Sequence, residues 1–295
     1  MTQNNPQVPW TDEQWARVNQ VIQEEASRAR VAATFLPLVG PLPADTDFVR
    51  EETISYGNRF MTIDDKNTIQ LATLQVKVHI RGAQVADPEL TSVLALFRRA
   101  ANVLARLEDA IIFKGQPAAN QPPAGSPGLN PGAVVGGVWE ITGGQPSDGL
   151  FDAAAIGVAV PGTTPERVGH NLVPKVSECI GGLESRGHFG PFALVLDNKF
   201  FEAAQTPEPR SFVLPQDRII PLLGGGSLLR SSQLDDYHGV MVALGGTPVE
   251  LVVASDMACD FLQVAPDPVV SIFRVREKIA LRIKEHNAIV RLTHP

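Results

Sequence analysis

The side chains best suited to catalysis or metal binding are scattered along this sequence. Its 295 residues include six histidines and two cysteines. None of them has the His-x-x-x-His, Cys-x-x-Cys or His-Glu-x-x-His spacing typical of zinc sites and metalloproteases. Because a catalytic triad can assemble from distant positions in the folded chain, an enzyme whose site is invisible in the sequence stays open as an alternative. The residues in question are His79, His170, His188, His238, His286, His294, Cys179 and Cys259.

Short polar and glycine-rich segments favour structural explanations over chemical ones. Asp235-Asp236-Tyr237-His238 lies where a turn before a strand is expected, and Asp64-Asp65 lies in a predicted hairpin tip. Both are typical of solvated turns rather than of metal sites. Gly224-Gly225-Gly226 lacks the following Lys and Ser/Thr of a phosphate loop, so it predicts the end of a helix. We therefore predict no catalytic residue, no metal site and no cofactor.

Composition narrows the class of protein further. The chain has 25 Lys and Arg against 32 Asp and Glu, a net charge of −7, which argues against general nucleic-acid binding. Two distant cysteines do not suggest a disulfide framework and favour a reducing compartment. The N-terminal residues lack the basic and apolar regions of a secretory signal, and no apolar run is long enough to span a bilayer. We expect a cytoplasmic protein with neither a membrane nor a nucleic-acid partner.

The longest predicted elements lie between Leu71 and Gly115. Alternating apolar residues from Leu74 to Ile80 predict a half-buried strand. Asp87-Pro88-Glu89 then supplies an N-cap, a proline at the first helical position and an acid in the first turn. The helical pattern continues for roughly 25 residues, a rod of almost 40 Å, and indicates a structural member. Its apolar stripe is Leu90, Val93, Leu94, Phe97, Ala101, Leu104, Leu107 and Ile111, with Arg98, Arg99, Arg106 and Asp109 expected to face elsewhere.

The same region carries a family resemblance. The run IRGAQVADPELTSVLALFRRAANVLARLEDAIIFKG resembles the signature region of the encapsulins, a linocin-like family of bacterial and archaeal shell proteins with the fold of the HK97-type phage capsid. A second run, GPFALVLDNKFFEAA, resembles the family's Gly-Pro-aromatic strand and the short helix after it. The family's spine helix ends in a Glu-Asp pair, an apolar residue, a Phe and a Gly, which here are Glu108, Asp109, Ile111, Phe113 and Gly115.

The resemblance, which extends from about Trp10 to Leu292, implies an α+β fold. It is an HK97 phage-capsid-like fold with a long spine helix, an extended hairpin loop and a mixed α/β apical domain. We expect five segments: an N-terminal arm and inner-face helix (1–46), the extended hairpin (47–80), the spine helix of the peripheral domain (81–116), the apical domain with a Pro/Gly-rich insertion at 117–164 (117–238), and C-terminal strands completing the peripheral domain (239–295). The role of the insertion stays open.

Two of these segments carry expected contacts with other proteins. Thr11 and Gln14 form a capping box for a helix that continues to about Phe35. The pattern favours packing of this helix on its own core. In encapsulins the corresponding helix lies on the inner face of the shell and helps to form the groove that docks the tail peptide of the enclosed enzyme. Both can hold, because such a helix has one side on the core and one side towards the lumen. The predicted cargo-docking residues are Trp15, Ile22, Arg28, Arg30 and Phe35.

The hairpin is predicted to have arms around Phe48–Tyr56 and Thr68–Ile80. A hairpin of this length cannot bury both faces within its own subunit, and the resemblance suggests that it lies over a neighbouring subunit. The residues of its expected intersubunit tip are Gly57, Asn58, Asp64, Asp65 and Lys66.

A proline-containing loop in the second domain is a candidate pore. In the family, this part of the apical domain points to the five-fold axis, where each side chain becomes a ring that selects solutes by charge. An ordinary solvated turn on the outer surface is the alternative. The predicted pore-loop residues are Thr206, Pro207, Glu208, Pro209, Arg210 and Ser211.

Local patterns predict the remaining elements. They include a short strand at Val134–Ile141, a helix at Pro165–Leu183 interrupted at Pro174, and a bulge near Glu277-Lys278. Val240–Leu244 and Val249–Ala254 flank Gly245-Gly246, which predicts a hairpin.

These features together predict a self-assembling shell subunit of an icosahedral nanocompartment, in about sixty copies or a multiple of sixty. By resemblance, the shell encloses a cargo enzyme, commonly a dye-decolourising peroxidase or a ferritin-like protein, and admits small solutes through pores. A phage or prophage capsid subunit that packages DNA is the main alternative. It is less favoured because the resemblance is to the encapsulin spine region, and because we expect no N-terminal scaffolding segment of the kind that phage capsids often carry. The cargo and the triangulation number stay open.

Overall fold

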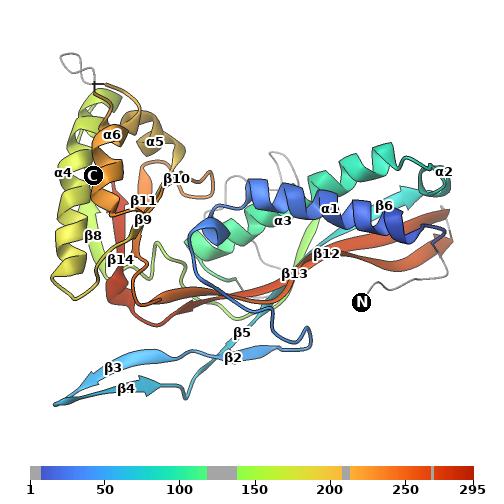
Figure 1. Cartoon of the computed structure of the whole chain (residues 1–295), viewed down its shortest axis with the longest axis horizontal. Helices are drawn as coiled ribbons and strands as arrows, with labels where there is room; N and C mark the ends of the chain where they lie inside the picture. Colours follow the sequence, from blue (N-terminus) through green and yellow to red (C-terminus); the bar gives the residue numbers. More distant parts are fainter. Residues whose placement is uncertain (1–7, 118–137, 208–212, 267–268) are drawn as a thin grey trace.

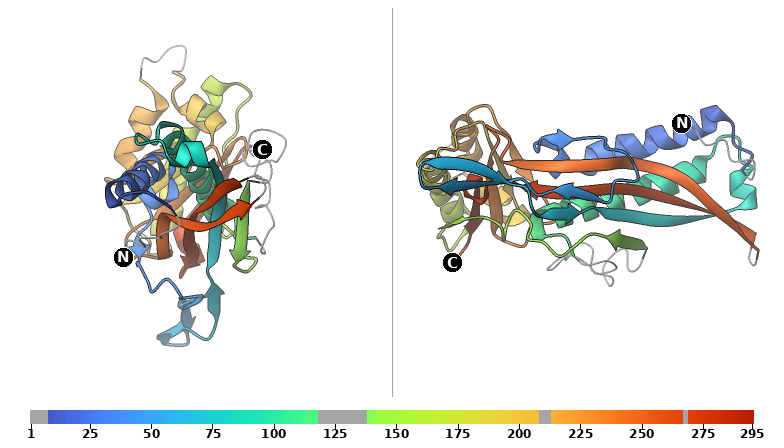
Figure 2. Two further views of the ribbon diagram at one scale, coloured as in Figure 1. Left: turned by 90° about the vertical axis from the view of Figure 1, so that its right-hand side faces the viewer. Right: turned by 90° about the horizontal axis from the view of Figure 1, so that it is seen from below.

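Two five-stranded sheets form the frame of the computed structural model, which describes residues 8–117, 138–207, 213–266 and 269–295. The molecule is elongated, with one sheet along its length and the other at one end (Figures 1 and 2). The long sheet has the strand order β1-β12-β13-β6-β7, and the end sheet has the order β10-β9-β11-β14-β8. Two further two-stranded ribbons, β2-β5 and β3-β4, extend from the body.

The long sheet supports the two longest peripheral helices. Its strands are β1 (Leu38–Val39), β12 (Val249–Pro266), β13 (Val269–Ile283), β6 (Ala72–Arg81) and β7 (Trp139–Gly143). Helices α1 (Asp12–Ala29) and α3 (Thr91–Lys114) run along one face of this sheet, with the short α2 (Gly82–Val85) between β6 and α3. In the core between this sheet and the helices, the ring of Trp10 stacks on that of Phe273, with 4.7 Å between the ring centroids.

Helix α3 is the spine helix that the sequence predicts. Its 24 residues make a rod of about 36 Å. The start differs from the prediction, because Leu90 adopts a left-handed conformation and the helix begins at Thr91. The carboxylate of Asp87 instead accepts hydrogen bonds from the backbone N–H of Glu89 and of Thr91, at 3.1 and 3.2 Å. At the other end, a Cβ on Gly115 would lie 2.3 Å from the carbonyl oxygen of Ser147, so the close approach requires glycine.

The N-terminal helix has the predicted start and an earlier end. The hydroxyl of Thr11 accepts from the backbone N–H of Gln14 at 3.2 Å, and the Gln14 side chain accepts from the N–H of Thr11 at 2.9 Å. The rings of Trp10 and Trp15 lie 4.9 Å apart. Helix α1 stops at Ala29, however, and a separate 3-10 turn, η1 (Ala32–Thr34), replaces the predicted continuation to Phe35.

The projecting hairpin is shorter than predicted. It consists of β2 (Phe48–Arg50) paired with β5 (Thr68–Gln70), and of β3 (Thr53–Gly57) paired with β4 (Phe60–Asp64). The residues after Gln70 form β6, which lies inside the long sheet between β13 and β7 and is not part of a free arm. Gly57 and Asn58 lie at the tip, as predicted. Residues 64–66, assigned to the tip from the sequence, lie further back, at the junction of the two ribbons.

The end sheet is covered by the apical helices. Its strands are β10 (Leu228–Arg230), β9 (Phe192–Leu196), β11 (His238–Ala243), β14 (Ile289–Thr293) and β8 (Ile156–Ala159). The helices are α4 (Pro165–Glu184), α5 (Asn198–Ala204), α6 (Pro215–Ile219) and the turn η4 (Ile220–Leu223), with η5 (His286–Ala288) leading into β14. Helix α4 runs through Pro174 without the predicted interruption. Its buried stripe, which includes Val168, Leu172 and Val176, packs in the apical core and holds the helix together across the missing N–H.

The predicted hairpin around Gly245-Gly246 is wrong. Strand β11 pairs with β9 and β14 in the end sheet, whereas β12 pairs with β1 and β13 in the long sheet. These glycines therefore carry the chain from one sheet to the other. The boundaries at 117–238 and 239–295 need the same correction, because β11 and β14 are apical while β7 belongs to the long sheet.

Three other local predictions have clear outcomes. Gly224, at φ 61°, ends η4 as predicted. The predicted bulge lies on β12, where the register shifts between Val253 and Ala258, opposite Glu277 and Lys278. Part of the predicted strand at 134–141, and residues 118–137 of the Pro/Gly-rich insertion, lie outside the described residues. Among the described helices, none combines the length and the hydropathy needed to span a bilayer.

Candidate functional site

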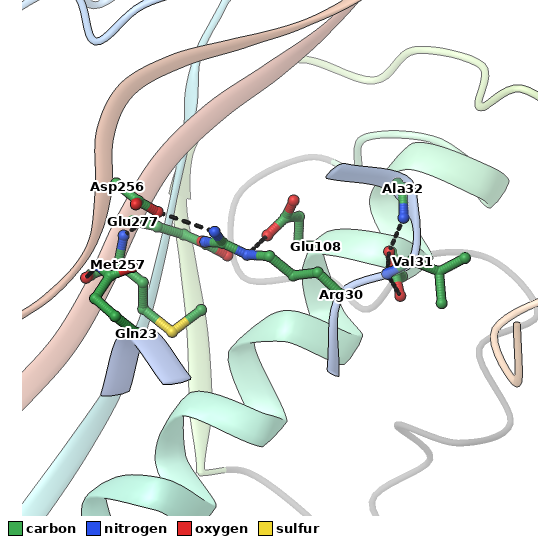
Figure 3. Close-up of polar contacts among 9 residues, drawn as sticks. Gln23, Arg30, Val31, Ala32, Glu108, Asp256, Met257 and Glu277 are labelled. Atoms are coloured by element: carbon green, nitrogen blue, oxygen red, sulfur yellow. Dashed lines mark hydrogen bonds and ion pairs between the residues drawn. The ribbon is translucent and has the colours of Figure 1, made fainter. Parts of the chain in front are cut away.

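Arg30, the first residue after α1, reaches carboxylates from three different elements (Figure 3). Its Nε lies 2.5 Å from Oε2 of Glu108 on α3, and its Nη1 donates to Oδ1 of Asp256 in the β12 bulge at 2.9 Å. Its Nη2 donates to Glu277 on β13. The Arg30, Glu108 and Glu277 side chains are only 14%, 1% and 0% exposed. We call these four residues the Arg30 cluster.

Burial and mutual charge set the protonation of this cluster. Burial alone would lower the pKa of Arg30, but the charges of Glu277, Glu108 and Asp256 raise it above its ordinary value. Burial raises the pKa of Glu277, against the opposing effect of Arg30. Burial, reinforced by the charge of Glu277, raises the pKa of Glu108 well above its ordinary value. The guanidinium therefore keeps its charge, while the two buried carboxyl groups hold protons more tightly than exposed ones do.

Asp109, the next residue on α3, holds the turn that follows α1. Its carboxylate accepts hydrogen bonds from the backbone N–H groups of Val31, at 3.0 and 3.1 Å, and of Ala32, at 2.8 Å. Burial raises the pKa of Asp109 to about 7, although these backbone hydrogen bonds act in the other direction. The prediction that Asp109 faces away from the core is wrong, because α3 is buried on this side by the end of α1.

The Arg30 cluster has a structural role rather than a catalytic or metal-binding one. Its carboxylates neutralise one buried cation, and no group of three or more potential metal ligands converges anywhere in the described ranges. Gln23 makes a further contact between α1 and β12, since its Nε2 donates to the carbonyl oxygen of Met257 at 2.5 Å. The cluster therefore fixes the end of α1 against α3, β12 and β13.

A groove with a largely apolar lining lies beside the cluster. It has a volume of about 220 Å³, and Arg30 and Asp256 lie at its polar side. The Leu38 side chain is 58% exposed at this groove. We call it the Leu38 groove; its apolar lining is Ala33, Leu38, Pro41, Leu251, Val253 and Ile279. These residues come from segments far apart in the chain, and the sequence analysis missed them.

Most of the predicted cargo-docking residues are not available to a partner. Trp15, Ile22 and Phe35 are buried within the subunit, so the assignment of these three as docking residues is corrected. Arg30 is largely buried in its cluster. Arg28 remains exposed on α1, with a 3.8 Å ion pair to Glu25.

The two other predicted sites have different outcomes. Of the predicted pore loop, the structure describes only Thr206 and Pro207, directly after α5; residues 208–211 lie outside the described ranges. The hairpin exposes large apolar side chains: Phe48, Phe60, Met61 and Ile63 are 56–67% exposed. Its base is fixed to the body by ion pairs of Lys278 with Asp47 and of Arg282 with Glu52.

The sequence is similar to a known family of shell proteins. The sequence profile of a family described as "encapsulating protein for peroxidase" matches residues 1–133 and 147–280. A type 1 encapsulin shell protein of Myxococcus xanthus is 26% identical over 305 residues, covering 96% of this chain and 93% of that protein.

Solved structures share the fold. A virus-like particle from Pyrococcus furiosus superimposes with a TM-score of 0.69 at 14% identity, covering 95% of this chain and 99% of that chain. The capsid of Myoviridae phage XM1 gives 0.59 at 11% identity, with coverages of 89% and 91%. The capsid-like α+β fold predicted from the sequence is therefore confirmed.

Proposed function

The chain belongs to the encapsulating-protein family, and from this premise we propose that it is a shell subunit of a closed encapsulin particle that encloses a cargo protein. The observation that carries the proposal is the hairpin, whose ribbon extends from the body with its apolar side chains in solvent. An apolar ribbon of this kind requires a partner. A second copy of the chain supplies one when subunits pack around symmetry axes.

A closed particle of about sixty subunits, or a multiple of sixty, is the expected assembly. Negative-stain electron microscopy of the purified protein should show uniform closed particles with a low content of nucleic acid. A stable monomer or dimer at micromolar concentration would contradict the shell function. Particles filled with DNA would instead support the phage-capsid alternative, which the family match disfavours. The cytoplasmic location stays a prediction.

The Leu38 groove is the proposed docking site for the cargo's tail peptide. Its apolar wall suits aliphatic side chains, and Asp256, whose side chain is 52% exposed at the polar side, suits a hydrogen-bond donor or a cation. The family description supports a peroxidase as the cargo, and a ferritin-like protein is the alternative. In this proposal the exposed Leu38 provides the main apolar contact.

Replacing Leu38 with Asp should reduce cargo loading by about 10- to 100-fold, because burial of a leucine contributes about 1.5–3 kcal/mol to binding. Co-expression of cargo and shell, followed by quantitative mass spectrometry of purified particles, measures the loading. Leu96→Asp is the matched control, since Leu96 is a 42% exposed leucine on α3 that does not line the groove. Equal loading of the two variants, in particles of normal diameter, would place docking elsewhere.

A further inference from the structure

A second cavity lies where the peripheral helices meet the apical domain. It has a volume of about 260 Å³, and its lining includes Ala29 and Val31, the two neighbours of Arg30 in the chain. Arg28 on α1 and Arg106 on α3 line it from one side, and Arg230 at the end of β10 lines it from the other. The polar residues Ser231, Ser232 and Gln233 complete the apical wall. We call this cavity the arginine pocket.

The positive charge of the pocket is only partly balanced. Arg28 is 75% exposed, and its ion pair with Glu25 is long, at 3.8 Å. The guanidinium of Arg230 lies over the ring of Phe201, 5.4 Å from the centroid, and has no carboxylate partner among the described residues. Burial and the nearby charge of Arg99 lower the pKa of Arg106, so the surroundings of this third arginine disfavour a further positive charge. An anion in the pocket would offset the charge of Arg230, which has no carboxylate partner among the described residues.

The apical wall contains a buried amide that lacks one partner. Gln233 is 1% exposed, and its Oε1 has no hydrogen-bond partner among the described residues. Its Nε2 donates to the hydroxyl of Ser232 at 3.1 Å. Rotation of the amide by 180° would let the hydroxyl of Ser232 donate to Oε1. A buried polar atom without a partner is costly, and this one lies in a wall of the pocket.

The carboxylate in the pocket opposes an anion only weakly. Asp109 is the acidic residue of the lining, and its oxygens accept hydrogen bonds from the backbone of Val31 and Ala32. Burial raises the pKa of this carboxyl to about 7. Near neutral pH the group is therefore partly protonated, and the three arginines determine the sign of the field in the pocket.

We propose that the arginine pocket binds a small oxyanion, either inorganic phosphate or the phosphate group of a small phosphomonoester. Guanidinium groups pair with phosphate through two parallel hydrogen bonds, and serine hydroxyls and amides supply further donors. The cavity of about 260 Å³ exceeds the roughly 30 Å³ that one water molecule occupies in the liquid. Because its walls come from both domains, a bound anion links the peripheral helices to the apical sheet. The inference goes beyond the proposed shell function and does not depend on it.

Isothermal titration of the full-length protein in a phosphate-free buffer tests the proposal. Inorganic phosphate should bind saturably, with one site per subunit, while chloride at equal ionic strength should give no saturable heat. Arg230→Gln should weaken binding by about 10- to 100-fold, the range expected for loss of a charge-assisted hydrogen bond. Arg218→Gln, which removes an exposed charge on α6 outside the pocket, should leave the affinity unchanged.

Further titrations distinguish free phosphate from a phosphate ester as the ligand. Glycerol phosphate with the affinity of inorganic phosphate would identify the terminal phosphate of an ester as a ligand, and much weaker binding would identify the free anion. Absence of saturable binding to the wild-type protein, or equal loss in both variants, would overturn the proposal. Displacement of phosphate by the cargo's tail peptide would also overturn it, because the pocket would then be part of the cargo dock. Circular dichroism verifies that both variants are folded.

Discussion

Replacing Arg30 with methionine should lower the free energy of unfolding by about 3–5 kcal/mol, the usual cost of removing one partner from a buried ion pair. Glu277 is fully buried and would lose its only hydrogen-bonded cation among the described residues, while Glu108 would lose its contact at 2.5 Å. Methionine keeps much of the length of the aliphatic stem, so the effect reports mainly on charge. Urea unfolding at one protein concentration measures it, because the stability of an assembled protein depends on concentration.

The loss should be larger at pH 8 than at pH 5. The folded-state pKa values of Glu108 and Glu277 are raised, so the folded protein binds more protons than the unfolded chain between the two sets of pKa values. The stability that these groups contribute is therefore complete below their unfolded pKa and is lost as the pH rises. Without the Arg30 charge, both pKa values rise further. An equal difference between variant and wild type at the two pH values would contradict this account of the cluster.

Asp109 adds to the same pH dependence in the wild-type protein. Its pKa rises from the ordinary 3.8 to about 7 on folding. At about 1.4 kcal/mol for each pKa unit, protonated Asp109 contributes about 4 kcal/mol to the free energy of unfolding at low pH. This contribution is lost as the pH rises from about 4 to about 7. Because Asp109 is present in both proteins, its contribution largely cancels when Arg30→Met is compared with the wild type at each pH.

Arg17→Met is the control for the loss of an arginine. Arg17 also forms an ion pair, at 3.3 Å to Glu89, but the two side chains are 52% and 75% exposed. Exposed ion pairs contribute about 0–1 kcal/mol. A loss as large as that of Arg30→Met would show that burial of the Arg30 cluster is not the cause of its effect.

The elements between Leu71 and Gly115 could be predicted because their signals are local. A period of two gives way to a helical period, and both are set by neighbouring residues. The depth of a residue within the fold is not a local property. Asp109 looks like an exposed acid on α3, yet the N–H groups that it binds lie 77 and 78 residues earlier in the chain.

The same reason explains the wrong hairpin at Gly245-Gly246. Two glycines between apolar runs indicate a reversal of the chain, but they do not specify which strands the two arms pair with. Here β11 joins β9 and β14, while β12 joins β1 and β13. The Leu38 groove was missed for a related reason, since its walls combine residues near 40, 250 and 280. The family resemblance placed docking on the N-terminal helix, whereas the residues that line this groove follow α1 or come from distant strands.

Changes to the projecting hairpin should have a large effect on particle assembly. Replacing Met61 and Ile63 together with Asp should abolish closed particles while the subunit stays folded. Both side chains are more than 60% exposed, and they lie on one face of the β3–β4 ribbon together with Ile54, which pairs with Ile63. If a neighbouring subunit covers this face, each contact loses about 3–6 kcal/mol of apolar burial, and two buried charges add to the penalty.

The matched control adds the same charges to the ribbon without removing any of its exposed apolar side chains. Thr62 alternates with Met61 and Ile63, so its side chain faces the other side of the ribbon, and Asn58 lies in the turn. The double variant with Asp at Asn58 and Thr62 should therefore still form particles. Size-exclusion chromatography and electron microscopy measure assembly, and circular dichroism verifies the fold. Normal particles from the Met61 and Ile63 variant would mean that this apolar face is not an intersubunit contact. Loss of particles from both variants would mean that added negative charge, rather than the loss of apolar burial, prevents assembly.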